Sequence, residues 1–490
     1  MSITIENPRT DTAARVGTPP RIVQGGMGTA ISGWALARAV ARTGQLGVVS
    51  GTALDVVCAR RLQDGDPGGH VRRALAAFPD PQIALRILDT YFVEGGIAPD
   101  TPYRPVLRHT VASARALQEL TVAANFVEVF LAKEGHDGVV GINYLHKIDL
   151  PLPASCYGAL LAGVDYVCVG AGNPADIPEL VRTLARHERA ALDVRIVGAR
   201  SDLQVVFEPQ DIVPPSPTGP GRAPLSMPQV LAIVASVDLA EALAADPRWR
   251  PDGFVVEGPL AGGHNAPPRG PRAVDTIGQP VYGARDEVDI ARIVALGLPV
   301  WVAGACASPQ AVRRALALGA AGVQAGTVFA VSDESGLATT LKDQIRRRVM
   351  DDDLQVRADW RVSPTGFPFR VAELPGTWTD PAAVAARRPV CDLGFLRSAY
   401  LTDEGRVDYR CPAEPEGVYL RKGGRAANRD GRVCLCNALF AACGMPQRRG
   451  ADREPALVTV GADLEPVARL LRDGHGSYSA ADAVAYLLTD

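Results

Sequence analysis

The histidine at position 264 closes a short glycine-rich turn, Ala261-Gly262-Gly263-His264, which follows an apolar run at 254–257. An imidazole titrates near neutral pH, so a histidine held at the end of a strand can act as a general acid or base. The glycines beside it allow the backbone to approach a ligand closely. A histidine in a surface loop is the more common arrangement, but this position after a strand makes His264 the candidate catalytic residue.

Two turns of small residues occur in the stretch 297–329, which alternates an apolar run, a turn, a helical pattern, a second apolar run and a second turn. Gly304 and Ala305 form the first turn, and Gly326 and Thr327 form the second. Turns of this kind present backbone N–H groups and a hydroxyl to a phosphate without any Lys or Arg. A phosphate site after the last two strands is common in (β/α)8 barrels. The stretch therefore predicts a phosphorylated cofactor, with packing of small residues as the alternative.

Other candidate residues also follow apolar runs. Gln24-Gly25-Gly26-Met27-Gly28 comes after the first run, where three glycines leave room for a flat ligand. Asn143 ends the third run, and its carboxamide offers a donor and an acceptor to a heteroaromatic ring. Lys147 and Asn265 are candidate substrate-binding residues, and a solvated or structural loop position is the alternative for each.

The elements that must position these residues alternate between strands and helices. Apolar runs predict strands at 21–24, 46–50, 138–143, 166–169, 230–236, 254–257, 300–303 and 322–325. Helical patterns separate most of them, at 33–43, 155–163, 174–189, 239–245, 286–296 and 309–318. Eight strands with interleaved helices predict an α/β fold, a (β/α)8 TIM barrel.

Insertions and an extension enlarge this barrel beyond the usual size. Three insertions are predicted at about 51–137, 192–227 and 265–285; the first contains a long helix at 114–133, and the second a hairpin (VRIVGA, LQVVFEP) with a Pro/Gly-rich connection. We expect the barrel to occupy 18–350 and a Cys-rich extension to occupy 351–490, with helices at 464–471 and 480–488.

Composition excludes several function classes. The chain has 490 residues, 47% of them hydrophobic, and a formal net charge of −3 with charges mixed along its length, so we expect no nucleic-acid partner. It has no apolar run long enough to span a bilayer, and its polar N-terminus does not resemble a signal peptide. We therefore expect a cytoplasmic protein without a membrane partner. Nine cysteines, an odd number, argue against a secreted disulfide framework.

Five of the cysteines lie in the extension. Cys391, Cys411, Cys434 and Cys436 are candidate ligands of a zinc ion or an iron–sulfur cluster, with Cys443 nearby. Their spacing lacks the usual C-x2-C pairs, so buried thiols that pack as small hydrophobic residues are the alternative.

Five short segments resemble the motifs of FMN-dependent nitronate monooxygenases, formerly called 2-nitropropane dioxygenases, in the same order: QGGMG, GINY, GGH, AGA and GAAGVQAGT. Two longer segments are more similar to the PfaD-like branch, the trans-acting enoyl reductases of polyunsaturated fatty acid and polyketide synthases. They are ANFVEVFLAKEGHDGVVGINYLHKIDLP and YGALLAGVDYVCVGAGNPADIP. The resemblance covers residues 18 to 345.

The resemblance implies an enzyme with non-covalent FMN, with His264 as the catalytic residue. The implied cofactor-binding residues are Gly25, Gly26, Met27, Asn143, Gly262, Gly263, Gly304, Ala305, Gln324, Gly326 and Thr327. Three positions depart from the monooxygenase pattern: Leu260 stands in place of a Glu, and Ala266 and Ala305 each stand in place of a Gly. These departures weaken the expectation of nitronate oxidation and leave flavin binding intact.

The activity implied is electron-pair transfer between a flavin and a small organic or acyl-thioester substrate. Enoyl reduction in polyketide or fatty-acid-type biosynthesis and oxidation of alkyl nitronates with O2 are both open, and a non-catalytic scaffold in a biosynthetic complex is the third alternative. NAD(P)H is the candidate electron donor, although no G-x-G-x-x-G opens a βαβ unit. An acyl carrier protein and a second copy of the chain are the candidate protein partners.

Overall fold

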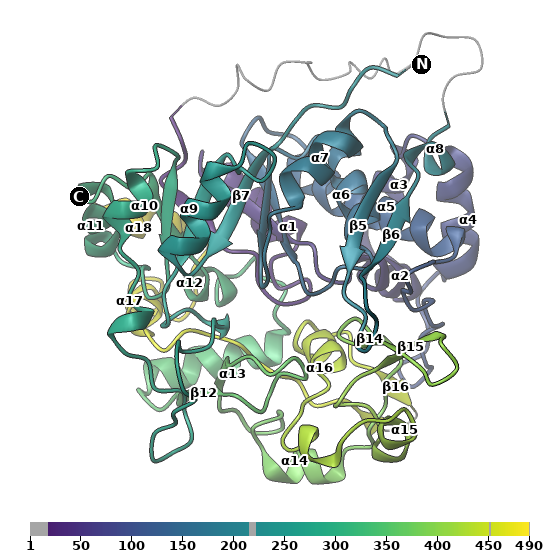
Figure 1. The fold of residues 1–490 in the computed structure, drawn as a ribbon. Helices are drawn as coiled ribbons and strands as arrows, with labels where there is room; N and C mark the ends of the chain where they lie inside the picture. The colour runs from purple at the N-terminus through teal and green to yellow at the C-terminus, as the bar shows by residue number, and fades with distance from the viewer. Residues whose placement is uncertain (1–17, 215–221, 450–451, 490) are drawn as a thin grey trace.

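Eight parallel strands form one sheet in the order β1-β11-β10-β8-β7-β4-β3-β2. The computed structural model describes residues 18–214, 222–449 and 452–489. The strands are β1 (Ile22–Gln24), β2 (Gly47–Ser50), β3 (Val140–Leu145), β4 (Tyr166–Gly170), β7 (Gln229–Val234), β8 (Gly253–Glu257), β10 (Val300–Ala303) and β11 (Gly322–Ala325). A parallel bridge between Val23 and Leu46 joins the two ends of the sheet. The sheet is therefore a closed (β/α)8 barrel, which confirms the predicted fold (Figure 1).

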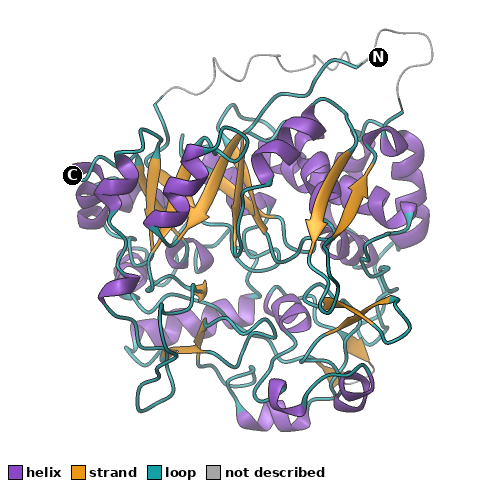
Figure 2. Ribbon diagram, in the orientation of Figure 1, coloured by secondary structure: helices purple, strands orange, loops and turns teal. Residues whose placement is uncertain are grey.

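Helices follow every strand and cover the outside of the barrel (Figure 2). They are α1 (Trp34–Ala41), α5 (Arg115–Lys133), α6 (Leu152–Leu161), α7 (Ile177–Ala185), α9 (Val237–Ala245), α10 (Ile290–Val294), α11 (Pro309–Ala317), and, after the last strand, α12 (Thr327–Ala330) and α13 (Thr339–Met350). Helix α11 begins as its sequence predicts: the Ser308 side chain accepts a hydrogen bond from the Ala311 N–H, and Pro309 occupies the first turn.

The interior of the barrel is filled by side chains rather than open. Trp301 on β10 is 1% exposed and packs with Val23, Leu231 and Val255 from other strands. The indole N–H of Trp301 donates to the Pro20 carbonyl at 2.7 Å, so this large side chain is also satisfied as a donor. The packed interior leaves the carboxyl ends of the strands as the place for a ligand.

The long insertion after β2 adds helices beside the crossover helix α5. These are α2 (Leu54–Gln63), the short 3-10 helix η1 (Pro67–Gly69), α3 (His70–Ala76) and α4 (Pro81–Tyr91). Helix α5 buries most of its 19 residues, because it packs between α1, α2 and α6. The predicted helix at 114–133 thus matches α5 within one residue.

The insertion after β4 is a hairpin of β5 (Ala190–Val194) and β6 (Leu203–Phe207), followed by α8 (Pro209–Ile212). The second arm lies where the sequence predicts it, but the first arm begins at Ala190 rather than at Val194. In β5 buried and exposed residues alternate, whereas Val197 has already left the hairpin and bridges Tyr400. Most of the Pro/Gly-rich connection and the N-terminal residues 1–17 lie outside the described residues.

The segment after α13 lies across the carboxyl ends of the barrel strands (Figure 1). Its elements are β12 (Val356–Asp359), β13 (Phe369–Ala372), α14 (Pro381–Ala386), β14 (Ser398–Leu401), β15 (Val407–Arg410), α15 (Glu416–Arg421), η3 (Ala426–Asn428), α16 (Leu435–Ala442), β16 (Arg448–Arg449), β17 (Asp452–Arg453), α17 (Glu465–Asp473) and α18 (Ala480–Leu487). Helices α17 and α18 return to the barrel and pack against α13, α1 and α12. Leu471 and Val484 share one hydrophobic core with Val323 of β11, so this segment is packed into the barrel wall.

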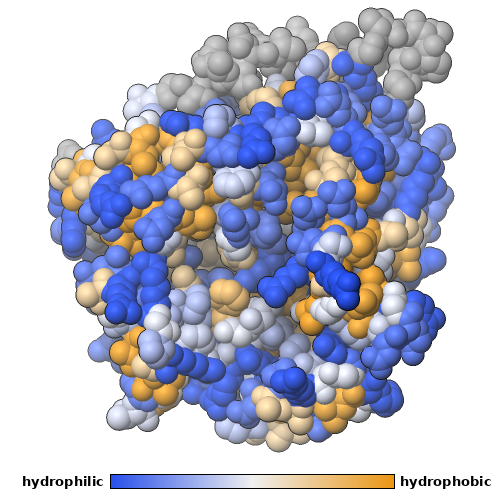
Figure 3. Space-filling view, in the orientation of Figure 1, coloured by the Kyte–Doolittle hydropathy of each residue, from blue (hydrophilic) through white to orange (hydrophobic). Residues whose placement is uncertain are grey.

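The face shown in Figure 3 is mostly hydrophilic, and its apolar side chains gather in several separate patches. In the described part of the chain, no helix is long and apolar enough to cross a bilayer.

Candidate active site

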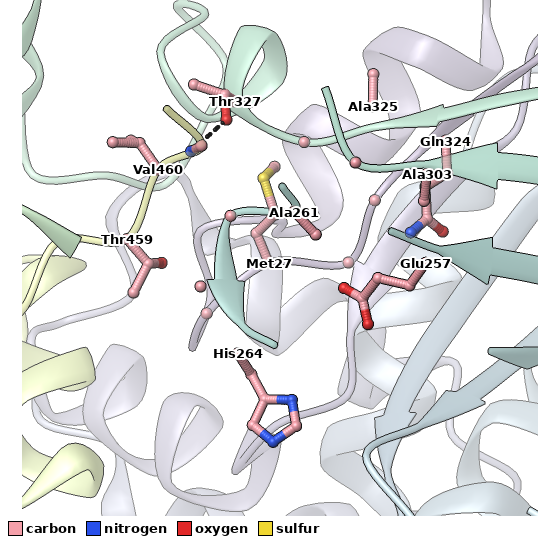
Figure 4. A pocket seen from close by; sticks show the side chains of 18 of the residues that line it. Met27, Glu257, Ala261, His264, Ala303, Gln324, Ala325, Thr327, Thr459 and Val460 are labelled. Carbon is pink, nitrogen blue, oxygen red and sulfur yellow. Dashed lines mark hydrogen bonds between the residues drawn. The ribbon is translucent and has the colours of Figure 1, made fainter. Parts of the chain in front are cut away.

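One cavity opens at the carboxyl ends of the barrel strands (Figure 4). All the predicted cofactor residues line it, together with the predicted catalytic residue: Gly25, Gly26, Met27, Asn143, Gly262, Gly263, His264, Gly304, Ala305, Gln324, Gly326 and Thr327. Among the described lining residues there is no Lys or Arg. The sequence motifs, spread over 303 positions of the chain from Gly25 to Thr327, therefore meet in one place.

The turn after β10 has the backbone shape of an anion-binding nest. Gly304 and Ala305 are both left-handed, with φ of +96° and +54°. A left-handed alanine is uncommon and persists where the surroundings enforce it, often at a functional site. No backbone carbonyl of the described residues accepts a hydrogen bond from the N–H of Ala305, Cys306 or Gly326. These free donors converge with the Thr327 hydroxyl, which fits the phosphate of a nucleotide-like cofactor.

A residue of the C-terminal segment completes this phosphate turn. The Gly461 N–H donates to Thr327 Oγ1 at 2.8 Å, shown as the dashed line in Figure 4. Because the oxygen accepts this bond, the hydroxyl proton remains free to be donated toward the cavity. A Cβ on Gly262 would lie 2.7 Å from the Gly461 nitrogen, so the His264 turn and the C-terminal segment are also in close contact.

The glycine-rich loop after β1 is held rigid by buried hydrogen bonds. The Gln24 side chain donates to Ser32 Oγ at 2.9 Å and accepts from the Val48 N–H at 3.0 Å. Ser32 Oγ in turn accepts from the Met27 N–H and donates to the Gly25 carbonyl, both at 2.9 Å. This network fixes Gly25 and Met27 at the cavity wall without using polar groups of the cavity itself.

Gly26 lies directly against Asn143, whose Cβ would be only 2.4 Å from a Cβ added at position 26. No other residue than glycine fits there without movement of β3. The Asn143 side chain is 8% exposed and has no protein hydrogen-bond partner among the described residues. Its carboxamide is therefore free to bond the edge of a ring that lies on this loop.

His264 belongs to the two-residue strand β9 (Gly263–His264), which pairs antiparallel with β13 of the C-terminal segment. Phe369 lies opposite His264 in this pairing, and the two rings meet edge to face with centroids 5.5 Å apart. The Phe367 ring also packs against the imidazole, with ring centroids 5.0 Å apart. The imidazole is thus enclosed by two aromatic rings from a segment more than 100 residues further along the chain.

Lys147 lies beside this imidazole, although it does not line the cavity wall. Its Nζ is 2.5 Å from His264 Nε2 and 2.9 Å from the centroid of the Phe367 ring. Burial lowers the pKa of Lys147 from 10.5 to about 7. Burial, reinforced by the neighbouring lysine charge, lowers the pKa of His264 to about 3. The histidine is therefore a neutral imidazole at physiological pH, which the sequence alone did not indicate.

Two acidic residues also line the cavity. Glu257 ends β8, and burial raises the pKa of its carboxyl to about 7, so a large fraction is protonated near neutral pH. Asp463 comes from the C-terminal segment near Cys306, and burial raises its pKa above the usual 3.8. Neither Glu257 nor Asp463 was among the candidate site residues predicted from the sequence.

The functional residues that sequence reasoning missed come from the C-terminal segment: Phe367, Phe369, Thr459, Gly461 and Asp463. None belongs to a glycine-rich turn after a barrel strand, which was the signal that located the others. Their positions depend on β13 pairing with β9 and on α17 packing against α13.

Asn265 does not face the cavity. It is fully buried, and its amide donates to the Ala261 carbonyl at 2.7 Å, so it shapes the turn that carries His264. Its Oδ1 has no partner among the described residues.

The structure does not support the metal interpretation of the tail cysteines. Within the described ranges, no group of three or more His, Cys, Asp or Glu side chains is placed so that it could hold a metal ion. Cys411 and Cys434 instead pack with Ala413 and Cys436 in a small apolar cluster. Burial raises the pKa of Cys391 to about 12, so these thiols are protonated and behave as small hydrophobic side chains.

Residues 225–365 match the family model of nitronate monooxygenase. The matched segment contains the His264 turn and both phosphate turns. No curated protein matches the sequence of the chain.

Solved structures of similar shape include FabK from Thermotoga maritima, with 17% identity and a TM-score of 0.45 over 98% of this chain and 96% of that one. Nitroalkane oxidase from Streptomyces ansochromogenes has 14% identity and a TM-score of 0.46 over 96% and 95% of the two chains. These structural similarities are too low to assign roles to residues of the cavity. The barrel itself is established by the pairing of its strands. The family match agrees with the resemblance of the sequence motifs, and residues 225–365 of the chain are similar to the nitronate monooxygenase family.

Proposed function

We propose that the chain is an FMN-dependent enoyl reductase, which reduces the carbon–carbon double bond of an α,β-unsaturated acyl thioester. The observation that carries the proposal is the single cavity that holds a left-handed nest and the Thr327 hydroxyl, together with a neutral His264. The free amides of the nest fit a phosphate, and the glycine wall formed by Gly25 and Gly26 fits a planar ring.

When bound, FMN supplies the electron pair of the reaction. The residues of the chain then have separate tasks. Ala305, Gly326 and Thr327, which line the cavity, would hold the phosphate through N–H groups and a hydroxyl, and Asn143 would bond the ring edge. His264 Nδ1 has no protein hydrogen-bond partner among the described residues, so it is the atom from which a proton reaches the substrate. Phe367 and Phe369 keep water from the imidazole.

Two observations favour an acyl substrate over a nitronate. Leu260, which replaces the Glu of the monooxygenase pattern, is 53% exposed and lines the cavity. Phe369 and Ile233 line it as well, so the substrate meets apolar side chains where a small anionic nitronate gains nothing. Nitronate oxidation with O2 remains the second candidate, since the family match at 225–365 supports it.

The proposal is tested with purified protein. We expect a yellow protein with a flavin spectrum that NADPH reduces anaerobically, and whose flavin a crotonyl thioester then reoxidises in stopped flow. The His264→Ala variant should keep the flavin and lose reoxidation by the thioester. Colourless protein that ignores added FMN contradicts the proposal, and flavin reduction by an alkyl nitronate alone favours the monooxygenase.

We also propose that the thioester is presented by an acyl carrier protein and that the chain works as a homodimer. Comparing kcat/KM for a carrier-bound and a free thioester tests the first, and light scattering tests the second. If the chain is instead a non-catalytic scaffold, His264→Ala should leave assembly of the biosynthetic complex unchanged. Deletion of residues 351–490 should then prevent that assembly.

A further inference from the structure

A lysine without a carboxylate partner lies behind the candidate catalytic histidine. Lys147 Nζ contacts only His264 Nε2, at 2.5 Å, and the Phe367 ring, at 2.9 Å from its centroid, among the contacts of the described residues. A half-buried ammonium group normally pairs with an acid. Lys147 lies on a loop that turns sharply after β3. A backbone hydrogen bond from the His146 N–H to the Gly170 carbonyl, at 2.8 Å, fixes the position of this loop.

Among the residues that the structure describes, no other charged side chain pairs with either group. The loop of Lys147 also carries His146 and Asp149, and β8 and β13 carry Glu257 and Arg370, but the structure pairs none of them with Lys147 or with His264. Arg370 is directed instead to the Pro259 carbonyl, at 3.2 Å. The Lys147–His264 contact is therefore an isolated pair in an aromatic enclosure.

We propose that Lys147 is a proton relay and positioning residue: it donates to His264 Nε2, so that the imidazole proton resides on Nδ1 and faces the substrate. The two ring nitrogens of a neutral imidazole cannot both carry a proton, so a donor at Nε2 determines the tautomer. This inference rests on the proposed function for the identity of the substrate, but not for the tautomer itself.

The protons of the relay balance. The Nδ1–H bond of His264 breaks as the proton moves to the α-carbon of the substrate, and Nε2 forms a bond to a proton from Lys147 Nζ. Lys147 is left as a neutral amine, which the lowered pKa of about 7 makes accessible, and it recovers a proton from water. No oxidation or reduction occurs in this step. Histidine passes from one neutral tautomer to the other, so no buried imidazolium is required.

The test uses the flavin-loaded protein with Lys147→Met, which has no proton to give, and Lys147→Arg, which keeps a donor but does not release a proton near neutral pH. The first readout is the ¹⁵N spectrum of the histidine rings, with the His264 signals assigned by their absence in His264→Gln. We expect the wild-type protein and Lys147→Arg to show the Nδ1–H tautomer. In Lys147→Met we expect mixed tautomers and a His264 pKa that moves back toward 6.5, because the lysine charge is gone.

The second readout is the pH profile of flavin reoxidation by a crotonyl thioester in a single turnover. The wild-type rate should fall as the pH rises through about 7, because the ammonium form of Lys147 is lost there. Lys147→Arg should lose about 10²- to 10⁴-fold of the rate, the usual contribution of a positioned acid. The reoxidation rate of Lys147→Met should be equally low, and it should not fall further as the pH rises through about 7.

The outcomes separate the relay from the proposed function. A wild-type imidazole with its proton on Nε2, or a tautomer unchanged in Lys147→Met, overturns the relay even if the protein is an active enoyl reductase. A protein that does not reduce enoyl thioesters, but has the expected tautomer shift, overturns the proposed substrate and keeps the positioning role. Flavin absorbance and a thermal melt establish that each variant is folded.

Discussion

The Gly461 N–H donates a hydrogen bond to the hydroxyl of Thr327, 134 positions earlier in the chain, at 2.8 Å. Thr327 begins α12 at the end of the last barrel strand, whereas Gly461 lies between β17 and α17 in the C-terminal segment. The hydroxyl that is expected to bond a phosphate is thus oriented by a residue outside the barrel. We therefore expect cofactor binding and the folding of the C-terminal segment to be coupled through this contact.

The Thr327 hydroxyl gives the first prediction. Thr327→Val removes a hydrogen bond to a charged group, which is worth about 1.5–3 kcal/mol, so the Kd of FMN should rise about 10- to 100-fold. Riboflavin, which lacks the phosphate, should bind both proteins equally. Fluorescence titration of the apoprotein measures both ligands, and Thr327→Ser is the matched control that keeps the hydroxyl. Equal weakening of FMN and riboflavin would place the phosphate elsewhere.

The contact between Gly26 and Asn143 gives the second prediction. A Cβ at position 26 would lie 2.4 Å from the Asn143 Cβ, so Gly26→Ala forces β3 or the loop to move, at a cost of about 1–3 kcal/mol. The neighbouring Gly25→Ala is the control, because its nearest atom, the Ala325 carbonyl oxygen, is 3.4 Å away. Thermal melts of the two apoproteins should show a lower Tm for Gly26→Ala only. A Tm unchanged by Gly26→Ala contradicts the close approach.

The shared core of barrel and C-terminal segment gives the third prediction. Leu471 on α17 is fully buried in the core that contains Val323 of β11. Leu471→Ala should destabilise the protein by about 2–5 kcal/mol and release the flavin at a lower temperature. Leu420→Ala, at a residue that is 40% exposed on α15, should change stability by less than about 0.5 kcal/mol. If the segment folded independently, Leu471→Ala would leave flavin release unchanged.

Asp463 gives the fourth prediction, on pH. Its pKa is raised by burial, so the ionised carboxylate is disfavoured in the folded protein. The unfavourable effect is absent below the usual pKa of 3.8 and grows as the pH rises through the raised value, where the carboxylate also repels a dianionic phosphate. Asp463→Asn should therefore tighten FMN binding at pH 7 and make no difference at acid pH. Titrations of both proteins across pH 4.5–8 with FMN and with riboflavin test this, since riboflavin should be insensitive. FMN binding that Asp463→Asn leaves unchanged at pH 7 would show that no phosphate lies beside this carboxylate.

Much of the barrel could be predicted from the sequence, because parallel strands buried on both faces appear as short apolar runs. All eight predicted runs are barrel strands, and each predicted cavity residue lies either on one of these strands or in the loop that follows it. The first arm of the β5–β6 hairpin was misplaced because the segment from Val194 to Ala199 contains more β-branched residues, which favour strands, than the segment from Ala190 to Val194. Pairing with Phe207 and alternating burial decided the register, and neither is visible in the local sequence.

The residues of the C-terminal segment that pack on His264 could not be predicted in the same way. Phe367 and Phe369 occur in a segment rich in Pro, Gly and charged residues, and no local sequence pattern near them indicates a contact with His264. They reach the imidazole because β13 adds to the edge of β9, a pairing between residues 105 positions apart in the case of Phe369 and His264. Likewise the Lys147–His264 contact joins two loops whose proximity depends on the closure of the barrel. Such relationships are set by tertiary packing and not by local pattern.

The packing of α18 on α1 also has a consequence for how the protein is made. Helix α1, at Trp34–Ala41, packs against α18, which ends at Leu487, so one wall of the barrel stays uncovered until the chain has been synthesised beyond residue 487. At ordinary rates of translation that delay is on the order of tens of seconds. During this interval the apolar face of the nascent barrel is exposed to chaperones and to other chains, and we expect a variant that lacks α18 to aggregate rather than fold.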